Sequence, residues 1–416
     1  MQTLPGFRDF LPSDCATRNY IFAKWREVCR RYGFVEWDGP VLEPTELYQK
    51  KSGAEIVGQL FNFVDKGERE VAMRPELTPT LARVVAAHER EFKKPIKWFS
   101  IGQFYRYEKQ QRGRLREHYQ LNCDIVGEAS PNADADLIAL CIDILRGFGF
   151  AESDFVMRIS DREFWTDFLR EKNVAPDRWS EVLQTIDKSE RESPEKTAEK
   201  LGTLAEPVLS ILKNGGSSEK LDRLIEGLRA RGLADFVNVD VRIVRGLAYY
   251  TGTVFEAFDR KGKLRAIAGG GRYDNLIEQL SDGATKMPAL GFAMGDVVLG
   301  ELIREHDAAT TVMAKAIQLG KSIDFYVVIA KEERRSDALT QIQQLRDRGY
   351  RVDYPLAPTK VGKQFQAAED LGAATAILYG DEWPQVKIKT LATRNERLVD
   401  HQSLLTEIGK STSDRP

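Results

Sequence analysis

A cluster of arginines beside tyrosines and short amide side chains is the feature of this sequence best suited to chemistry. Residues 103–120 read QFYRYEKQQRGRLREHYQ, and they hold five cations: Arg106, Lys109, Arg112, Arg114 and Arg116. The whole chain has 61 Lys and Arg against 63 Asp and Glu, a formal charge of -2, so this density is local. A guanidinium stays charged and presents a planar fork of donors, which suits it to binding phosphate groups.

Alternation with period two predicts that this stretch is a hairpin with one polar face. Phe104, Arg106 and Glu108 would share one face of the outgoing strand, and QQRGR would form the turn. The polar face has three interpretations: it meets water, it binds a triphosphate, or it contacts a nucleic-acid strand. Short, directional side chains favour a ligand over water. On the return strand these side chains are His118, Gln120, Asn122 and Asp124.

Three further motifs carry groups suited to binding. MRPELTPTLARVV places Glu76 and Thr78 just before a helix, where a capping arrangement is the structural alternative. VRGLAYYTGTVFEAF puts Arg245 and paired tyrosines before a strand, where tyrosines ordinarily are half-buried packing residues. AGGGRYDNLI has three glycines that allow close approach of the backbone to a ligand or a strand, although tight turns explain most such runs.

Other features of the sequence exclude several classes of protein. The amino terminus, MQTLPGFRDFLPSD, has no cationic start followed by an apolar run, and no apolar segment is long enough to span a bilayer. We therefore expect a cytoplasmic protein with no membrane partner. The 4 cysteines show no CxxC spacing and the 4 histidines are scattered, so we predict no metal-binding set of side chains and expect buried free thiols.

Helical and strand periodicities predict the elements that would position these residues. Ser13 would cap a first helix, and Gly33 would end it. A second helix covers the apolar repeat from Leu137 to Phe148, and a strand follows at Phe155. Residues 165–238 form a predicted helical insertion that contains the charged stretch DKSERESPEK, which we interpret as solvated.

Strand patterns return at VDVRIV and TGTVFEAF, and a polar connection (306–321) follows later in the chain. Beyond this connection, strands alternate with helices, which predicts a small α/β domain with a largely parallel sheet. A chain of 416 residues can form two or more domains. We predict an α+β fold, with a mostly antiparallel core (1–320) that includes the insertion and a terminal α/β domain (321–416).

Together, these motifs resemble histidyl-tRNA synthetase, a class II aminoacyl-tRNA synthetase family. GFRDFLP, RPELTP, FYRYEKQQRGRLREHYQ, RGLAYYTGTVFE and GGGRYDNL occur in the order of that family, and the terminal α/β domain resembles its anticodon-binding domain. RGLAYYTG followed by GGRYD is the most specific part, because it is associated with the histidine pocket. The resemblance implies a class II antiparallel sheet core that activates L-histidine with ATP and transfers it to tRNA(His).

The resemblance also implies roles at the nucleotide and the tRNA. Arg106 would contact the α-phosphate of ATP, Arg114 the outer phosphates, Glu108 the adenine amine, and His118 would stack on adenine. Arg245 would lie beside the carboxylate of histidine and the α-phosphate, which makes Arg106 and Arg245 the expected catalytic pair. Mg²⁺ would accompany the phosphates without an assigned protein ligand. The acceptor end of the tRNA would contact two residues of the hairpin turn, Lys109 and Gln111. The resemblance implies no DNA partner.

The amino acid itself would be held by both ends. The resemblance assigns its α-amino group to Glu76, Thr78 and Gln120, and its imidazole to Asp124, Tyr250 and Tyr273. A site that satisfies both ring nitrogens rejects side chains that leave its own polar groups unpaired. Activation needs no protein nucleophile, because the carboxylate of histidine attacks the α-phosphorus in line, and positioning with fixed positive charge lowers the barrier.

Several positions depart from the pattern of the family. Val298 stands where motif 3 usually has an arginine on the γ-phosphate, Ala248 replaces an aspartate, Leu77 a glycine, and Asp124 a glutamate. We interpret these changes as a branch variant with an altered grip on the triphosphate; the alternatives are weaker ATP binding or lost activity. Motif 1, in GFVEWDGPVLEP, resembles the dimer strand of class II enzymes and implies a homodimer.

Two rival functions follow from the same residues. The first is a catalytically inactive paralogue that senses histidine as the regulatory subunit of ATP phosphoribosyltransferase, and the second is a nonenzymatic RNA-binding module. The terminal domain and the set of arginines favour the synthetase over the regulatory subunit, and the amino acid pocket favours it over the RNA-binding module.

Overall fold

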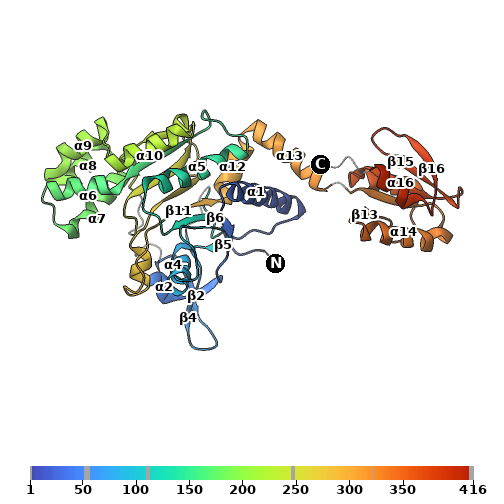
Figure 1. The fold of residues 1–416 in the computed structure, drawn as a ribbon, viewed down its shortest axis with the longest axis horizontal. Coiled ribbons are helices and arrows are strands. Elements are labelled where there is room, and N and C mark those ends of the chain that lie inside the picture. The colour runs from blue at the N-terminus through green and yellow to red at the C-terminus, as the bar shows by residue number, and fades with distance from the viewer. Residues whose placement is uncertain (1, 51–56, 109–112, 245–248, 322, 412–416) are drawn as a thin grey trace. The chain divides into compact units, whose positions relative to one another are not determined.

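The computed structural model describes residues 2–50, 57–108, 113–244, 249–321 and 323–411. The chain divides into two compact units, Met1–Met313 and Ala314–Pro416 (Figure 1). No helix in these described ranges is both long enough and apolar enough to cross a membrane.

The first unit is built on an eight-stranded sheet with the order β1-β5-β6-β11-β10-β9-β7-β8. The two outer pairs, β1 with β5 and β7 with β8, are parallel, and the other neighbours are antiparallel. This arrangement confirms the predicted antiparallel core. In chain order, the strands are β1 (Val35–Glu36), β5 (Ile96–Tyr105), β6 (Glu117–Val126), β7 (Phe155–Asp161), β8 (Val237–Val239), β9 (Thr253–Asp259), β10 (Ala268–Arg272) and β11 (Ala289–Gly295).

The predicted arginine hairpin is formed by β5 and β6, and Phe104 pairs with His118 in its register. Strand β5 ends at Tyr105, so the prediction that the outgoing strand includes Arg106 and Glu108 is wrong. The backbone N–H of Arg106 still donates to the carbonyl of Arg116, at 2.9 Å. The next N–H, of Tyr107, donates to Gln59 at 2.7 Å, because the chain here turns to a different segment.

Helices α1 (Pro12–Arg31) and α5 (Pro131–Gly147) lie together over one face of the large sheet (Figure 1). The Sγ atoms of Cys29 in α1 and Cys123 in β6 are 3.5 Å apart, so the odd-numbered side chains of β6 face these helices. Ser13 is not the cap of α1, because the helix already begins at Pro12 and Asp14 accepts the N–H of Leu11. Gly33 ends α1 as predicted, with a φ of 76°.

A small three-stranded sheet, in the order β2-β4-β3, precedes the hairpin along the chain. Helix α4 contacts α2 and α11, and its buried side chains join those of α11 in one apolar cluster. The elements of this region and of the end of the unit are β2 (Leu42–Pro44), α2 (Thr45–Gln49), β3 (Phe61–Val64), β4 (Glu70–Met73), α4 (Thr78–Ala87), α11 (Leu276–Leu280) and α12 (Asp296–Arg304).

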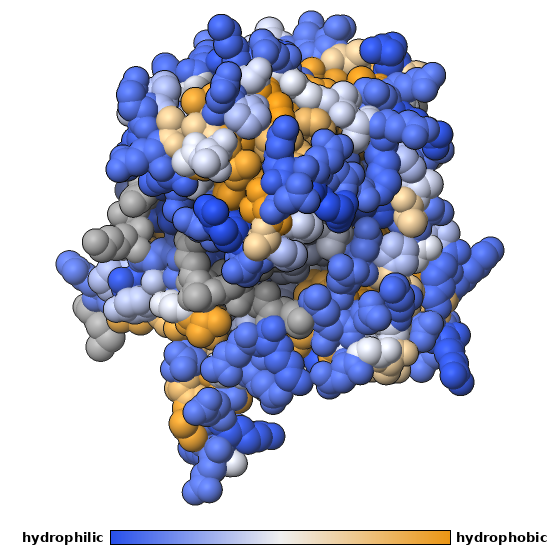
Figure 2. Space-filling model, turned by 90° about the vertical axis from the view of Figure 1, so that its left-hand side faces the viewer, coloured by the Kyte–Doolittle hydropathy of each residue, from blue (hydrophilic) through white to orange (hydrophobic). Residues whose placement is uncertain are grey.

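The predicted insertion is helical, and it has a core of its own around Trp165, whose Nε1 donates to the carbonyl of Val241 at 2.7 Å. Its elements are α6 (Arg162–Glu171), η1 (Pro176–Arg178), α7 (Trp179–Lys188), α8 (Pro194–Leu201), η2 (Gly202–Leu204), α9 (Ala205–Asn214), α10 (Glu219–Ala230) and η3 (Ala234–Phe236). Figure 2 views the molecule from the side on which the insertion lies in Figure 1, and hydrophilic side chains cover most of the surface in this view.

Two expectations about connecting segments are wrong. The stretch VDVRIV was expected to be a strand, but β8 ends at Val239, and the Asp240 side chain then turns to the guanidinium groups of Arg158 and Arg242. The stretch 306–321 was expected to be a connection, but it forms helix α13 (Asp307–Lys321). Its alanine-rich sequence has high helix propensity, and this outweighs its polarity.

The second unit contains a five-stranded sheet in the order β13-β12-β14-β15-β16. Strand β12 is parallel to β13 and β14, whereas β15 and β16 continue the sheet antiparallel, so the sheet is less parallel than expected. The predicted alternation of strands and helices is confirmed as far as β14. The elements are β12 (Phe325–Ile329), η4 (Glu332–Arg334), α14 (Arg335–Asp347), β13 (Val352–Asp353), α15 (Val361–Asp370), β14 (Thr375–Tyr379), β15 (Gln385–Thr390), β16 (Glu396–Asp400) and α16 (Leu404–Ser411).

Candidate active site

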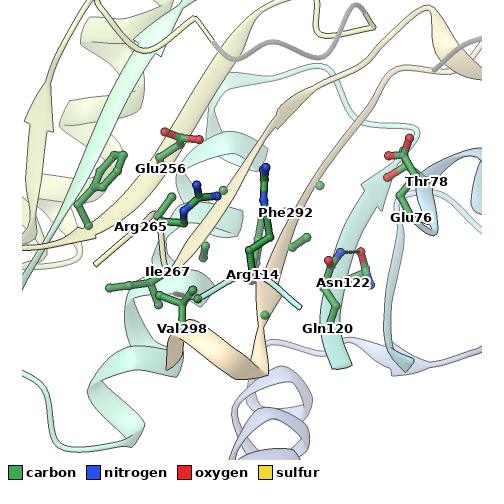
Figure 3. A pocket seen from close by; sticks show the side chains of 18 of the residues that line it. Glu76, Thr78, Arg114, Gln120, Asn122, Glu256, Arg265, Ile267, Phe292 and Val298 are labelled. Carbon is green, nitrogen blue, oxygen red and sulfur yellow. Dashed lines mark hydrogen bonds between the residues drawn. The ribbon is translucent and has the colours of Figure 1, made fainter. Parts of the chain in front are cut away.

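A cavity of about 830 Å³ opens on the large sheet, and the even-numbered side chains of β6 line it. It also receives residues from the segment before α4, from the end of the hairpin turn, and from β9, β10 and β11. The structure brings together here eight of the residues that we predicted from the sequence: Glu76, Thr78, Arg106, Arg114, Gln120, Asp124, Tyr250 and Tyr273. Figure 3 shows Glu76 and Thr78 at one end, Arg265 and Val298 toward the other, and Arg114 between them.

A smaller adjoining cavity of about 110 Å³ holds the remaining described candidates, Glu108 and His118. It shares Arg106, Arg114 and Val298 with the large cavity, so the two are continuous in their lining. Five positions that the sequence singled out lie outside the described residues: Lys109, Gln111, Arg112, Arg245 and Ala248. Of the expected catalytic pair, the structure therefore describes Arg106.

Asp124 and Tyr273 form a buried hydrogen-bonded pair in the large cavity. The Tyr273 hydroxyl donates to Asp124 Oδ1 at 2.5 Å, and the two residues are 2% and 4% exposed, respectively. Burial raises the pKa of Asp124 to about 7, although the hydrogen bond from Tyr273 opposes this shift. The pair therefore offers a carboxyl group that can accept from, or when protonated donate to, a polar ring placed against it.

Glu76 forms a second pair, with Tyr249, which the sequence interpretation missed because it chose Tyr250 from the doublet. The Tyr249 hydroxyl donates to Glu76 Oε2 at 2.8 Å. The rings of Tyr249 and Tyr250 lie 5.1 Å apart, so both tyrosines belong to one aromatic cluster. Glu76 does not cap α4, which begins at Thr78 without a side-chain cap, so the capping alternative is wrong.

Gln120 and Asn122 continue the polar row on β6. Gln120 Nε2 donates to Asn122 Oδ1 at 2.8 Å, which leaves the Nδ2 atom of Asn122 buried without a hydrogen-bond partner among the described residues (Figure 3). An unsatisfied buried donor costs about 1–3 kcal/mol. Because Asn122 lines the cavity, a ligand acceptor would remove this cost; the sequence placed Asn122 on the polar face but assigned it no role.

The glycine run of AGGGRYDNLI lies within strand β10 and not in a turn. A Cβ atom on Gly270 would lie 2.2 Å from the carbonyl oxygen of Gly291 in β11, and one on Gly271 would lie 2.6 Å from the carbonyl oxygen of Thr253. Close approach to another strand is therefore the correct interpretation of the run. Gly291 itself faces the cavity, where an added Cβ would lie 1.9 Å from Asp124 Oδ1.

Arg272, beside these glycines, has a structural role. Its guanidinium donates to the Asp134 carboxylate and to the carbonyls of Glu128 and Ser130, at 2.6 to 3.1 Å. These contacts tie β10 to the start of α5 and fix the chain immediately before Tyr273. The RYD motif thus joins a buried anchor to a cavity residue.

The nucleotide-side candidates are already partly engaged. Arg106 Nε donates to the carbonyl of Pro75 at 2.9 Å, which aims the arginine past the RPELTP segment. Arg114 forms an ion pair with Glu108. Burial, with the nearby Arg106 charge, lowers the pKa of His118 to about 3, so its ring is neutral at physiological pH.

Two further arginines line the large cavity, and the sequence interpretation assigned neither of them to the site: Arg191, between α7 and α8, and Arg265, between β9 and β10. Arg191 belongs to DKSERESPEK, which we interpreted as solvated, so no local signal marked it. Arg265 immediately precedes the AIAGGGRYD stretch, which is the one pointer the sequence offered.

Asp296, two positions before Val298 in motif 3, is a structural anchor. Its carboxylate accepts from Arg8 Nη1 and from the N–H of Tyr119, both at 2.9 Å. Cys29, Cys123 and Cys141 are buried free thiols as predicted, whereas Cys15 is only half-buried. Within the described part of the chain, no cluster of three or more His, Cys, Asp or Glu residues is arranged to hold a metal ion.

A mostly antiparallel sheet with an arginine-lined cavity on one face, accompanied by a small α/β unit, is the architecture of a class II aminoacyl-tRNA synthetase. The family model for histidyl-tRNA synthetase matches residues 6–296, and a model for an anticodon binding domain matches residues 324–411. The chain belongs to the histidyl-tRNA synthetase family.

Similar proteins span almost the whole chain. A protein of Opitutus terrae named histidine--tRNA ligase is 45% identical over 433 residues, which covers 97% of each chain. A chloroplastic/mitochondrial histidine--tRNA ligase of Arabidopsis thaliana is 38% identical over 93% of this chain and 82% of its own. Both alignments therefore extend across the two units described above.

Solved structures share the fold. The histidyl-tRNA synthetase of Nostoc sp. PCC 7120 has a TM-score of 0.74 at 24% identity and covers 99% of both chains. A Bacillus halodurans protein described as an ATP phosphoribosyltransferase regulatory subunit/histidyl-tRNA synthetase has a TM-score of 0.71 at 22% identity, over 88% of this chain and 96% of its own. At these identities the likeness concerns the fold alone, so the site carries the argument about activity.

Proposed function

We propose that this protein is a histidine--tRNA ligase, which activates L-histidine with ATP, releases pyrophosphate and transfers the histidyl group to the 3′ end of tRNA(His). The observation that carries the proposal is the convergence, in one cavity, of two tyrosine–carboxyl pairs and the arginines Arg106 and Arg114. ATP is the energy source that this family uses, and tRNA and histidine are its other substrates.

The carboxyl pairs suit the two ends of histidine. Glu76 carries a carboxylate beside Thr78 and Gln120, and we assign the α-amino group of histidine to these three residues. Asp124, Tyr250 and Tyr273 would surround the imidazole, whose two nitrogens need one acceptor and one donor when the ring is neutral. An amino acid without an imidazole would leave these buried polar groups without hydrogen-bond partners. The site therefore binds such amino acids less tightly than histidine.

The arginine end suits the nucleotide. Arg106 and Arg245 would stabilise the charge that develops on the α-phosphate, Arg114 would hold the outer phosphates, and Glu108 and His118 would contact adenine. The Glu108–Arg114 ion pair must then open when ATP binds. Mg²⁺ would neutralise charge on the triphosphate, and we assign its ligands to phosphate oxygens.

The rest of the chain would serve the tRNA and the dimer. We propose that residues 1–320 are the catalytic core, with the insertion at 165–238, and that 321–416 bind the anticodon. Lys109 and Gln111 would meet the acceptor end. A cytoplasmic homodimer is proposed through motif 1, which exposes apolar side chains on the described surface: Val35 is 63% exposed and Leu42 42% exposed.

The direct test is exchange of labelled pyrophosphate into ATP with purified protein, histidine and Mg²⁺. Exchange that depends on histidine and not on other amino acids supports the proposal. Histidine binding without exchange at saturating ATP would identify the regulatory paralogue instead. Charging of tRNA(His) tests the second step, and a chain ending near residue 320 should raise the KM for tRNA far more than the KM for histidine; equal effects on both would contradict the tRNA role of the second unit.

A further inference from the structure

We propose that Arg265, between β9 and β10, binds the outermost phosphate of ATP. It would thereby supply the positive charge of the usual motif 3 arginine, whose position Val298 occupies. This inference rests on the proposed function, because it assigns a further residue to the same nucleotide site. It explains how a chain of this family can hold a triphosphate without the usual motif 3 arginine.

The position of Arg265 is the first argument. Val298 lies in the first turn of α12 and lines both cavities. A Cβ atom built on Gly113, next to Arg114, would lie 3.4 Å from Val298 Cγ2 and 3.9 Å from Arg265 Cδ. The stem of Arg265 therefore approaches the same point as the end of the valine side chain, so Arg265 lies beside the position from which a longer side chain at 298 would extend.

The direction of the nucleotide is the second argument. Glu76 and Thr78, which we assign to histidine, lie away from the end where Figure 3 shows Arg265 and Val298. Because the carboxylate of histidine attacks the α-phosphorus, the γ-phosphate must be the phosphate most distant from the amino acid. It is therefore expected at the end of the cavity that carries Arg265.

The concentration of positive charge is the third argument. Arg114, Arg191 and Arg265 line one cavity. Partial burial lowers the pKa of Arg265, the charges of Arg114 and Arg191 lower it further, and the charge of Glu108 opposes the shift. Gathering like charges at a partly desolvated surface costs free energy. Glu108 in the adjoining cavity and Glu256 in the large one offset part of this charge, and a triphosphate would neutralise more of it.

In the proposed step, a carboxylate oxygen of histidine forms a bond to the α-phosphorus. The bond from the α-phosphorus to the bridging oxygen breaks, and its electron pair leaves with pyrophosphate. Arg265 donates hydrogen bonds to the leaving group and loses no proton. It is therefore a binding residue for the leaving group, and its loss should weaken triphosphate binding more than monophosphate binding.

The experiment measures calorimetric affinities for ATP and AMP, together with pyrophosphate exchange, in the wild type and the Arg265→Ala variant. We expect the Kd for ATP to rise at least about tenfold, the scale of one charge-assisted contact. The Kd for AMP and the KM for histidine should stay within about twofold, because AMP lacks the outer phosphates. The matched control is Lys263→Ala, which removes one cation from the same segment but does not line the cavity, and it should match the wild type.

A second variant tests the exchange of roles directly. Introducing Val298→Arg into the Arg265→Ala protein should recover at least part of the ATP affinity, because a cation returns to the same space. An Arg265→Ala protein that folds and binds ATP like the wild type overturns the inference and leaves the proposed function intact. The inference is also overturned if Arg191→Ala loses affinity for ATP while Arg265→Ala does not.

The two claims can fail separately. If the wild type binds ATP more tightly than Arg265→Ala does but catalyses no histidine-dependent exchange, the proposed function is wrong and the phosphate contact stands. If the wild type binds no ATP, both are wrong.

Discussion

Replacing Gly291 by alanine should disable the imidazole end of the site while leaving the nucleotide end intact. The new Cβ would lie 1.9 Å from Asp124 Oδ1 and 2.8 Å from its Cγ. Nonbonded carbon and oxygen atoms need more than about 3 Å, so the carboxyl group must move by about 1 Å or more. This shift breaks or distorts the 2.5 Å hydrogen bond from Tyr273.

The expected magnitude follows from the bond that is lost. A hydrogen bond to a charged group contributes about 1.5–3 kcal/mol, so the KM for histidine should rise by about 10- to 150-fold. Steady-state pyrophosphate exchange, with histidine and ATP varied separately, gives both constants. The KM for ATP should change by less than about threefold, because Gly291 lies beside Asp124 and not beside the arginines.

Gly300→Ala is the matched control, because Gly300 lies in the same unit within α12 and an added Cβ would meet only Arg304 Nη1, at 3.5 Å. It should leave both constants unchanged and should slightly stabilise the helix. If Gly291→Ala keeps the KM for histidine of the wild type while remaining folded, Asp124 does not hold the imidazole. Equal increases in both KM values would instead indicate a general disturbance of the sheet.

Further predictions concern charge and burial at the same site. Burial raises the pKa of Asp124 to about 7, so the folded protein holds a proton that an unfolded aspartate releases near pH 3.9. The contribution of this group to stability therefore falls as the pH rises between those two values. Asp124→Asn should gain thermal stability relative to the wild type between about pH 5 and pH 8; a difference in melting temperature that stays constant with pH would contradict the assignment. Because His118 stays neutral, His118→Phe should keep the KM for ATP within about threefold, whereas His118→Ala should raise it at least about fivefold if the ring stacks on adenine; equal kinetics of the two variants would exclude stacking. Tyr249→Phe, which removes the donor to Glu76, should raise the KM for histidine by about tenfold but not the Kd for ATP, a difference that titration with each substrate would detect. Arg272→Ala should lower the free energy of unfolding by about 3–5 kcal/mol through the orphaned Asp134, and the double variant with Asp134→Ala should lose less than the sum of the single changes, as denaturant unfolding will show.

The arginine hairpin was predictable because its signals are local. The alternation of apolar and polar residues along 117–126 predicts which side chains share a face. In agreement with it, Gln120, Asn122 and Asp124 all line the cavity. The end of β5 was not predictable in the same way. Arg106 still bonds to Arg116, but the N–H of Tyr107 donates to Gln59, a contact between distant segments that no local pattern predicts.

Long-range pairs explain the other omissions. Glu76 and Tyr249 are separated by 173 positions, and only the closed sheet brings them together, so the choice between two adjacent tyrosines could not be made from periodicity. Arg191 lies in a charged stretch that reads as solvent-exposed, yet it lines the cavity. The VDVRIV stretch has strand composition, but the buried Asp240 draws arginines around it and ends the pairing.

The order of strands in the large sheet has a consequence for synthesis on the ribosome. The hairpin of β5 and β6 can form early, but the free edge of β6 pairs with β11, which is synthesised more than 160 positions later. Similarly, Arg8 donates to the carboxylate of Asp296, a residue 288 positions further along the chain. An unpaired strand edge invites pairing with other chains. A nascent chain therefore exposes the unpaired edge of β6 until α12 leaves the ribosome. A pause in translation before that point should favour aggregation or binding by chaperones, whereas a pause within the second unit should not.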